Sequence, residues 1–219
     1  HVVTVAHPDG SSSTITGTNV VLAGGSVPRT IPGFEPDGPV ITSDEVLTLE
    51  YVPAQVAVIG GGAIGCEFAS TFADLGAQVT ILEGLPKILP GLDTDVANVV
   101  VRSFKKKNID IKTGVKVLGH TPNGYGGTTV HFGAADSDAQ NLEVDAVVVS
   151  IGRRPFADQL GLHGTAVVVS DRGFVEVDQY CRTAEPGVYA VGDLINTPAL
   201  AHVGYAEAIL VIKQLLGEE

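Results

Sequence analysis

Several residue types are scarce or missing in this chain of 219 residues. It has no Met and no Trp, only two Cys, and 13 basic residues against 25 acidic ones. The cysteines, Cys66 and Cys181, lie far apart in the sequence, which excludes a CxxC motif and a metal-ligand spacing and argues against a disulfide scaffold. We therefore expect both thiols to be small buried hydrophobic groups, and we expect no metal site.

The acidic excess gives a formal net charge of −12 at pH 7. A surface of that sign repels phosphate backbones, so we expect no nucleic-acid partner and no anionic membrane partner. No apolar run reaches the roughly 18 residues of a membrane span, and the N-terminus lacks a signal-peptide pattern, which predicts a cytoplasmic protein. Because a complete natural chain begins with Met and this one begins with His1, we expect a piece excised from a longer protein.

The first 52 residues predict two strands, a linker and a short helix. Val2 to Val5 and Thr18 to Leu22 have strand patterns. Four prolines between residues 28 and 39 exclude a helix there and indicate an extended linker. Ser43 is the expected N-cap of a helix through Leu49.

A βαβ unit follows. Val56 to Ile59 is a short apolar run bounded by glycines, as in a strand that is buried on both faces. Apolar residues from Ile64 to Leu75 form one helical stripe, and Gly76 stands where a helix ends. Val79 to Leu82 is a second buried strand, so the pattern predicts an α/β fold with a parallel sheet.

The rest of the chain predicts two helices and several short strands. Asp93 is the expected N-cap of a helix to about Lys107, and Tyr205 to Leu216 is the expected last helix. The glycine-rich stretch 123–127 is typical of a hairpin tip. Strands are expected at Ile109–Thr113, Val115–Leu118, Thr128–Phe132, Ala146–Ile151, Val167–Val169, Phe174–Val177 and Val188–Val191.

Gly60 to Gly65 form a GxGxxG motif between the buried strand and the amphipathic helix. Gly60 permits the tight turn, Gly62 lets a diphosphate approach the backbone, and Gly65 lets helix and strand pack closely. Free N–H groups at the helix start favour phosphates. Glu83 ends the next strand, where its carboxylate accepts hydrogen bonds from ribose hydroxyls and repels a 2′-phosphate, so the predicted cofactor is NAD rather than NADP.

Other interpretations remain for these residues. FAD or S-adenosylmethionine also fits such a unit. Glu67 can be a first-turn acid matched to the helix dipole, and Asp193 a turn residue bonded to backbone. His202 can be a surface residue.

Four segments occur in a characteristic order: Ala23 to Ser26 after a strand, then Gly60 to Gly65, then Gly152 to Pro155, then Thr183 to Asp193. In these motifs, and over essentially its whole length, the sequence resembles the pyridine nucleotide-disulfide oxidoreductases. In those FAD enzymes an NAD(P) domain is inserted into the flavin domain.

The resemblance implies an α/β fold with three layers and a β-meander, in which a Rossmann-like NAD-binding domain is inserted in part of an FAD-binding domain. The implied boundaries are an FAD-domain segment at 1–52, the NAD-binding domain at 53–152, and an FAD and central-domain segment at 153–219.

Cofactor contacts are also implied by the resemblance, position by position. The NAD residues would be Gly60, Gly61, Gly62, Ala63, Ile64, Gly65 and Glu67 along the diphosphate towards the nicotinamide, Glu83 at the ribose, Val117 by the adenine, and Gly152 closing the site. The FAD residues would be Gly24, Gly25 and Ser26 along the cofactor, Asp193 at a ribityl hydroxyl, and Ala199, Leu200, Ala201 and His202 beside the isoalloxazine.

Within the family, Ala199 to His202 and Ile88 to Asp93 are similar to segments of the dihydrolipoamide dehydrogenases. Mercuric reductases and soluble transhydrogenases share much of the pattern. The dehydrogenase branch implies a homodimer that passes electrons between NAD and a lipoamide-type disulfide on a 2-oxoacid dehydrogenase complex.

The chain departs from the family in what it omits. The reactive Cys-x4-Cys, the first FAD-binding GxGxxG, and the C-terminal interface domain with its catalytic His-Glu pair do not occur here. We therefore expect no catalytic residue in this chain, no disulfide turnover by the chain alone, weak NAD(H) binding, and little or no bound FAD. An alternative of another class is a non-enzymatic NAD-binding module, although it would not need the motif around Asp193.

Overall fold

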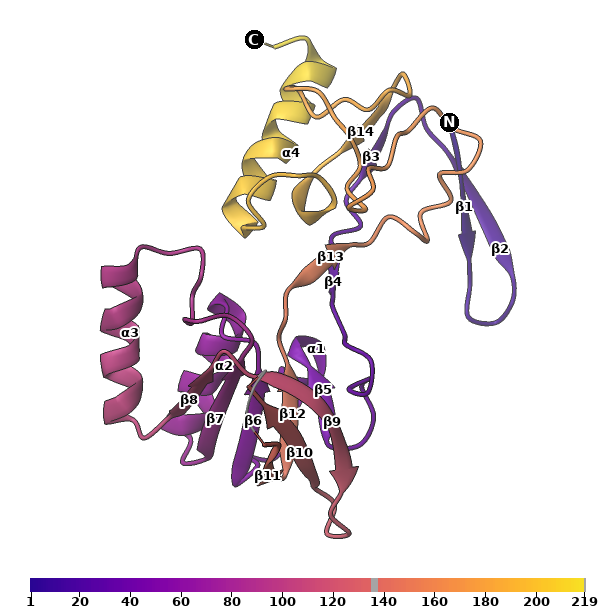
Figure 1. The fold of residues 1–219 in the computed structure, drawn as a ribbon. Helices are drawn as coiled ribbons and strands as arrows, with labels where there is room; N and C mark the ends of the chain where they lie inside the picture. Colours follow the sequence, from indigo (N-terminus) through magenta and orange to yellow (C-terminus); the bar gives the residue numbers. More distant parts are fainter. Residues whose placement is uncertain (135–137, 219) are drawn as a thin grey trace. The chain divides into compact units, whose positions relative to one another are not determined.

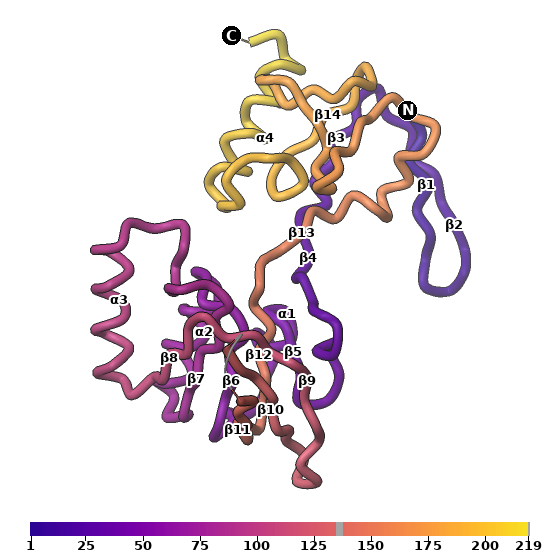
Figure 2. Tube along the Cα trace, viewed as in Figure 1, coloured from indigo at the N-terminus to yellow at the C-terminus, as the bar shows by residue number. Residues whose placement is uncertain are grey.

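The computed structural model describes residues 1–134 and 138–218, which divide into two compact units. One unit combines residues 1–27 with the chain from Arg154 onward, and the other is the continuous segment Pro28–Arg153 (Figures 1 and 2). The second unit is thus inserted between the two segments of the first. It begins at Pro28, whereas the sequence favoured residue 53, because residues 40–42 join its central sheet.

The central sheet of the inserted unit has five parallel strands. Its middle strand is the apolar run after Pro53, which is buried on both faces as predicted, with Val58 at 0% exposure. In spatial order the strands are β5 (Val40–Thr42), β12 (Ala146–Val149), β6 (Gln55–Ile59), β7 (Gln78–Glu83) and β8 (Asp110–Thr113).

Alternate residues of this sheet point into two different cores. Val56 and Val58 belong to the core shared with the helices α2 (Ala63–Asp74) and α3 (Thr94–Lys106). Ala57 and Ile59 belong to the core shared with a three-stranded antiparallel sheet. That meander consists of β9 (Lys116–Pro122), β10 (Thr128–Gly133) and β11 (Gln140–Val144), so the unit has three layers, as expected (Figure 1).

The helix caps agree with the sequence in one case and differ in another. Asp93 caps α3 by accepting a hydrogen bond from the Asp95 N–H at 2.8 Å. The predicted Ser43 cap is wrong, because Ser43 is already the first residue of α1 (Ser43–Val46). Thr42 is the N-cap, and it forms a capping box with Glu45.

The other unit contains a hairpin, a pair of parallel strands and the last helix. β1 (Val2–Ala6) and β2 (Ser12–Thr16) pair antiparallel, and β3 (Val20–Leu22) pairs in parallel with β14 (Val188–Ala190). A 3₁₀ turn, η1 (Gly192–Leu194), follows β14 and precedes α4 (Ala201–Leu216). Short strands β4 (Ser26–Pro28) and β13 (Arg153–Pro155) form a two-stranded sheet where the chain passes from one unit to the other.

Two expectations for this unit are wrong. Residues 167–169 and 174–177 form no strands, and a single bridge joins Val169 to Val175. Their apolar side chains instead fill the core of this unit, where Val175 is buried and Val167 and Val177 pack against it. In addition, α4 begins at Ala201 rather than at Tyr205.

Candidate functional site

The turn after β6 lies where the strand order of the parallel sheet reverses. From β6 the chain passes through α2, β7 and α3 to β8 on one side, whereas β12 and β5 lie on the other side. In open α/β sheets, ligands bind in the crevice at the carboxyl ends of the strands at such a reversal. Gly60 is the first residue beyond β6, so the glycine motif occupies this position.

Two of the motif glycines are required by close backbone contacts. Gly60 has φ +106°, and a Cβ there would lie 2.2 Å from the Ser150 carbonyl oxygen. A Cβ on Gly65 would lie 2.0 Å from the Gly60 carbonyl oxygen. The roles predicted for both, a tight turn and close helix packing, agree with this geometry.

The start of α2 is open on the side of the crevice. Its N-cap is Gly62, which supplies no side-chain hydrogen bond to the first turn, and a Cβ on Gly62 would meet no atom within 4 Å. Uncapped N–H groups at a helix N-terminus carry partial positive charge and bind anions. The turn therefore offers free space and hydrogen-bond donors at the same point.

Glu83, the last residue of β7, is directed at the glycine turn. It is only 8% exposed, and its two carboxylate oxygens accept hydrogen bonds from the backbone N–H groups of Gly61 at 2.6 Å and Leu85 at 2.7 Å. A carboxylate offers about four lone-pair sites, so two acceptor sites remain. Glu83 thus holds the turn and still has acceptor capacity towards the crevice.

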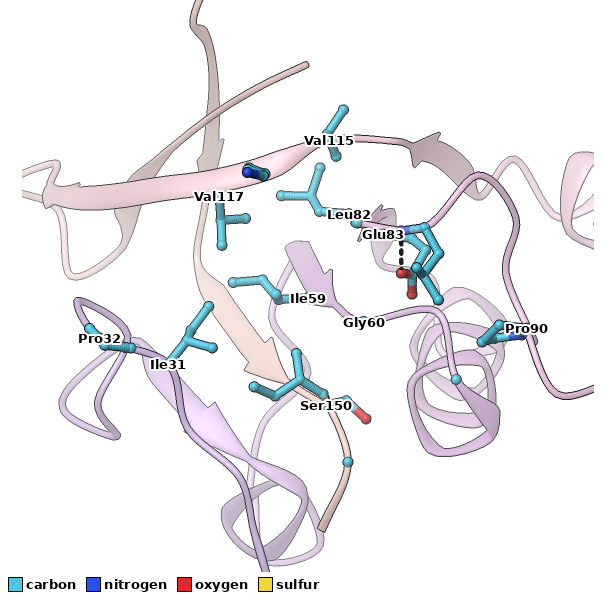
Figure 3. A pocket seen from close by; sticks show the side chains of 16 residues that line it. Ile31, Pro32, Ile59, Gly60, Leu82, Glu83, Pro90, Val115, Val117 and Ser150 are labelled. Carbon is cyan, nitrogen blue, oxygen red and sulfur yellow. Dashed lines mark hydrogen bonds between the residues drawn. The ribbon is translucent and has the colours of Figure 1, made fainter. Parts of the chain in front are cut away.

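A pocket of about 660 Å³ opens at this edge of the sheet (Figure 3). Val115, just before β9, and Val117 on β9 border one side, Ile31 and Pro32 border another, and Glu83 lies beside the turn at Gly60 (Figure 3). Apolar walls with a few polar groups are typical of small-molecule sites.

The pocket brings together half of the residues predicted to contact NAD. Gly60, Gly62, Glu83, Val117 and Gly152 line it. The other five do not line it; they are Gly61, whose N–H binds Glu83, and Ala63, Ile64, Gly65 and Glu67 in the first turns of α2. Glu67 is exposed to solvent.

Sequence reasoning missed Ile31 and Pro32, which it assigned to a plain linker. Phe34 anchors that segment, since it is 1% exposed and its ring lies 5.2 Å from the ring of His120. The apolar residues between the prolines were the available signal, because an exposed linker has no need of a buried Phe.

The residues predicted to contact FAD lie in the other unit, after two adjacent strands. The Ser26 hydroxyl, beyond β3, donates to the Asp193 carboxylate, beyond β14, at 2.6 Å. Gly24 lies close to Phe156 and Leu160, since a Cβ on Gly24 would be 3.2 Å from the Phe156 carbonyl oxygen.

The remaining predicted FAD residues follow η1. Ala199 and Leu200 precede α4, and Ala201 and His202 are its first two residues. All four are exposed. Glu207, one turn further along α4, was missed by the sequence analysis, although its carboxylate accepts the Gly192 N–H at 2.6 Å.

Both cysteines are free and buried, as predicted. Burial, and secondly the nearby Glu83 and Glu67 carboxylates, raise the pKa of the Cys66 thiol to about 11. Burial, and then Glu207 and Asp178, also raise the pKa of Cys181. Since thiolates are the reactive form, neither thiol is suited to redox exchange at neutral pH.

The described residues contain neither a candidate metal site nor a candidate membrane span. Among residues 1–134 and 138–218, no group of three or more His, Cys, Asp or Glu side chains is placed to hold a metal ion. In the same part of the chain, no helix has the length and apolar character that a bilayer crossing requires.

The parallel sheet, the strand-order reversal and the glycine-lined pocket have the topology of the dinucleotide-binding α/β folds. Comparison with known protein families identifies the family. The model of the pyridine nucleotide-disulphide oxidoreductases matches residues 1–208, and the chain belongs to that family.

One curated relative and two solved structures illustrate what the chain is similar to. A dihydrolipoyl dehydrogenase from Chlorobaculum parvum is 39% identical over 217 residues, covering 99% of this chain and 46% of that protein. The HOCl-induced flavoprotein disulfide reductase RclA from Escherichia coli, solved as a Cu(II) complex, matches with a TM-score of 0.91 at 29% identity. LpdA from Mycobacterium tuberculosis matches with a TM-score of 0.88 at 28% identity.

These matches cover nearly all of this chain but only part of each relative. RclA is matched over 48% of its chain and LpdA over 46%. The chain thus spans about half the length of the relatives that it matches.

Proposed function

We propose that this chain forms the NAD(H)-binding part, and the later flavin-contacting part, of a FAD-dependent NAD(H):disulfide oxidoreductase of the dihydrolipoamide dehydrogenase type. The observation that carries the proposal is the pocket beyond β6, where an open helix N-terminus and the buried Glu83 carboxylate meet. Relatives named dihydrolipoyl dehydrogenase, at 36–39% identity, support the choice within the family.

The pocket chemistry fits NAD(H). The diphosphate would take the open N–H groups at the start of α2, where Gly62 leaves room for phosphate oxygens. The ribose hydroxyls of the adenosine would donate to the acceptor sites left on Glu83. A 2′-phosphate would meet the same carboxylate as a like charge, which favours NADH over NADPH.

In the other unit, the Ser26–Asp193 pair fits a polyol. Asp193 accepts one hydrogen bond from Ser26 and retains acceptor sites for a ribityl hydroxyl of FAD. When both cofactors are bound, they supply the hydride and electron chemistry, and the protein contributes binding and orientation. This chain's part in that work is to hold a diphosphate, a ribose and a ribityl chain.

The substrate, the partner complex, the location and the oligomeric state that we propose apply to a polypeptide of the relatives' full length. It would reduce or oxidise a lipoamide-type disulfide, serve a 2-oxoacid dehydrogenase complex in the cytoplasm, and form a homodimer. The 219-residue chain has only two cysteines, Cys66 and Cys181, both buried with raised pKa values. It would therefore not turn over a disulfide by itself, and it would bind NAD(H) weakly and little or no FAD.

Titration with NADH and NADPH, followed by nicotinamide fluorescence, tests the pocket. We predict that the wild-type chain binds NADH at least about tenfold more tightly than NADPH, as one repulsive charge contact of about 1.4 kcal/mol would give. Glu83→Arg should remove or invert that preference, because it replaces a ribose acceptor with a phosphate-binding cation.

Two further variants separate a loss of cofactor selectivity from damage to the glycine turn and from the change in net charge. Glu83→Gln keeps one acceptor for the Gly61 N–H and should weaken NADH binding while narrowing its advantage over NADPH. Glu143→Arg makes the same charge change as Glu83→Arg at an exposed position on β11 and should leave the preference intact. An unchanged NADH preference in Glu83→Arg would mean that Glu83 does not face the ribose.

A further inference from the structure

Glu207 is a buried carboxylate that the proposed cofactor contacts do not use. It lies on the inner face of α4 and is 8% exposed. Within the same unit its neighbours are the turn that follows β14 and the buried Cys181 thiol, whose pKa it helps to raise. No charged partner of Glu207 is found among the described residues.

Among the described residues, this carboxylate has one hydrogen bond, which reaches the turn that carries Asp193. Glu207 Oε2 accepts the backbone N–H of Gly192 at 2.6 Å. Gly192 has φ +70°, a left-handed conformation that opens the 3₁₀ turn. On the other side of the same turn, Asp193 accepts the Ser26 hydroxyl at 2.6 Å. Two side-chain contacts, one from α4 and one from the segment after β3, therefore fix two consecutive residues.

The second oxygen of Glu207 makes this arrangement unfavourable for stability. Oε1 is buried and has no hydrogen-bond partner in the part of the chain that the structure describes. A buried acceptor without a partner destabilises a fold, and an apolar side chain of similar volume is commonly tolerated better at such a position. The contact that sets Glu207 apart from an apolar residue is the bond to Gly192.

We propose that Glu207 is a positioning residue, which holds the Gly192–Asp193 turn in the conformation that presents the Asp193 carboxylate for a ribityl hydroxyl. The functional meaning of this role rests on the proposed flavin contact of Asp193. The positioning itself is a property of the unliganded chain and is measurable without any cofactor.

Amide hydrogen exchange at Gly192, followed by NMR in the 219-residue chain, is the direct test. In Glu207→Met the Gly192 amide should exchange at least about tenfold faster than in the wild type, while the melting temperature stays the same or rises. Glu207→Gln keeps a carbonyl acceptor, so the amide should remain within about threefold of the wild-type rate. A purely structural role would instead lower stability and protection together.

Two matched variants calibrate the result. Glu185→Met removes another carboxylate bond to a backbone N–H, that of Ala166, and should leave Gly192 unchanged. Val211→Ala opens a cavity in the core on the buried face of α4, the helix that carries Glu207. It shows how far a loss of stability alone speeds exchange of the Gly192 amide.

Three results would overturn the proposal. They are a Gly192 rate in Glu207→Met equal to the wild type, a rise no larger than the stability loss in Val211→Ala explains, and a Glu207→Met chain that fails to fold. None involves Glu83 or NADH, so the positioning role and the proposed function can fail separately.

Discussion

At the scale of single residues, Gly62 and Gly65 of the glycine motif differ in what a side chain would meet. A Cβ on Gly65 would lie 2.0 Å from a backbone oxygen, whereas a Cβ on Gly62 would meet nothing within 4 Å. Gly65 is therefore required by the fold, whereas the space at Gly62 is needed only for the diphosphate contact that we propose.

This contrast yields a prediction with a built-in control. Gly65→Ala should lower the free energy of unfolding by at least about 2 kcal/mol, because backbone must move to admit the methyl group. Gly62→Ala should change it by less than about 1 kcal/mol and yet weaken NADH binding at least about tenfold. Urea unfolding and NADH titration check both. Equal NADH binding in Gly62→Ala and wild type would show that no phosphate approaches there.

The buried thiol of Cys66 gives a pH-dependence prediction. Its pKa is about 11 in the folded chain, against 9.0 as the ordinary value, so the folded state keeps its proton where the unfolded state loses it. This contribution to stability is complete below about pH 9 and is lost as the pH rises towards 11. The melting temperature should therefore fall more steeply between pH 9 and 11 in the wild type than in Cys66→Ala. If the melting temperatures of the two chains fell equally between pH 9 and 11, the raised pKa of Cys66 would be contradicted.

The sequence identified Glu83 but not its surroundings. Its position at the end of a strand after the glycine motif was sufficient to select it. Its bonds to the Gly61 and Leu85 N–H groups depend on how the turn and the loop after β7 fold against each other. Glu207 was missed for a related reason, because an isolated acid in an apolar helix gives no sign of the backbone group that it binds.

At the scale of elements, the strands buried on both faces were predictable and the weakly patterned ones were not. The apolar runs of β6, β7 and β12 identify them directly, since both faces are covered. β5 was hidden because it directly follows Pro39, and its pairing with β12 is long-range. Residues 167–177 show the opposite error, because apolar residues in an irregular loop can fill a core without a hydrogen-bonded ladder.

The corrected cap of α1 is testable by a pair of substitutions. Thr42→Ala removes both the cap and its bond to Glu45, and should lower the free energy of unfolding by about 1 kcal/mol or more. Ser43→Ala lies one residue inside the helix, where its hydroxyl accepts a hydrogen bond from Arg153 at 3.1 Å, and should lower the free energy of unfolding by less than Thr42→Ala does. Chemical denaturation of the two variants compares them. A larger loss in Ser43→Ala would restore Ser43 as the cap.

At the scale of the whole molecule, the order of four motifs carried more information than any element. Their order supports the family resemblance, which implies an inserted domain, and residues 28–153 form a compact unit between two segments of another. The inserted unit begins at Pro28 and not at residue 53. Prolines indicate extended chain, but they do not indicate which unit that chain packs into. Ile31, Pro32 and Phe34 lie in that proline-rich segment and pack within the inserted unit.

Whether the pocket beyond β6 binds NAD(H), as we propose, can be measured by the amide chemical shifts of the ¹⁵N-labelled chain during an NADH titration. We predict the largest shifts at Gly60 to Gly65, Glu83, Val117 and Gly152. Shifts confined to other surfaces, such as the groove between α3 and β8, or no shifts at millimolar NADH, would contradict it.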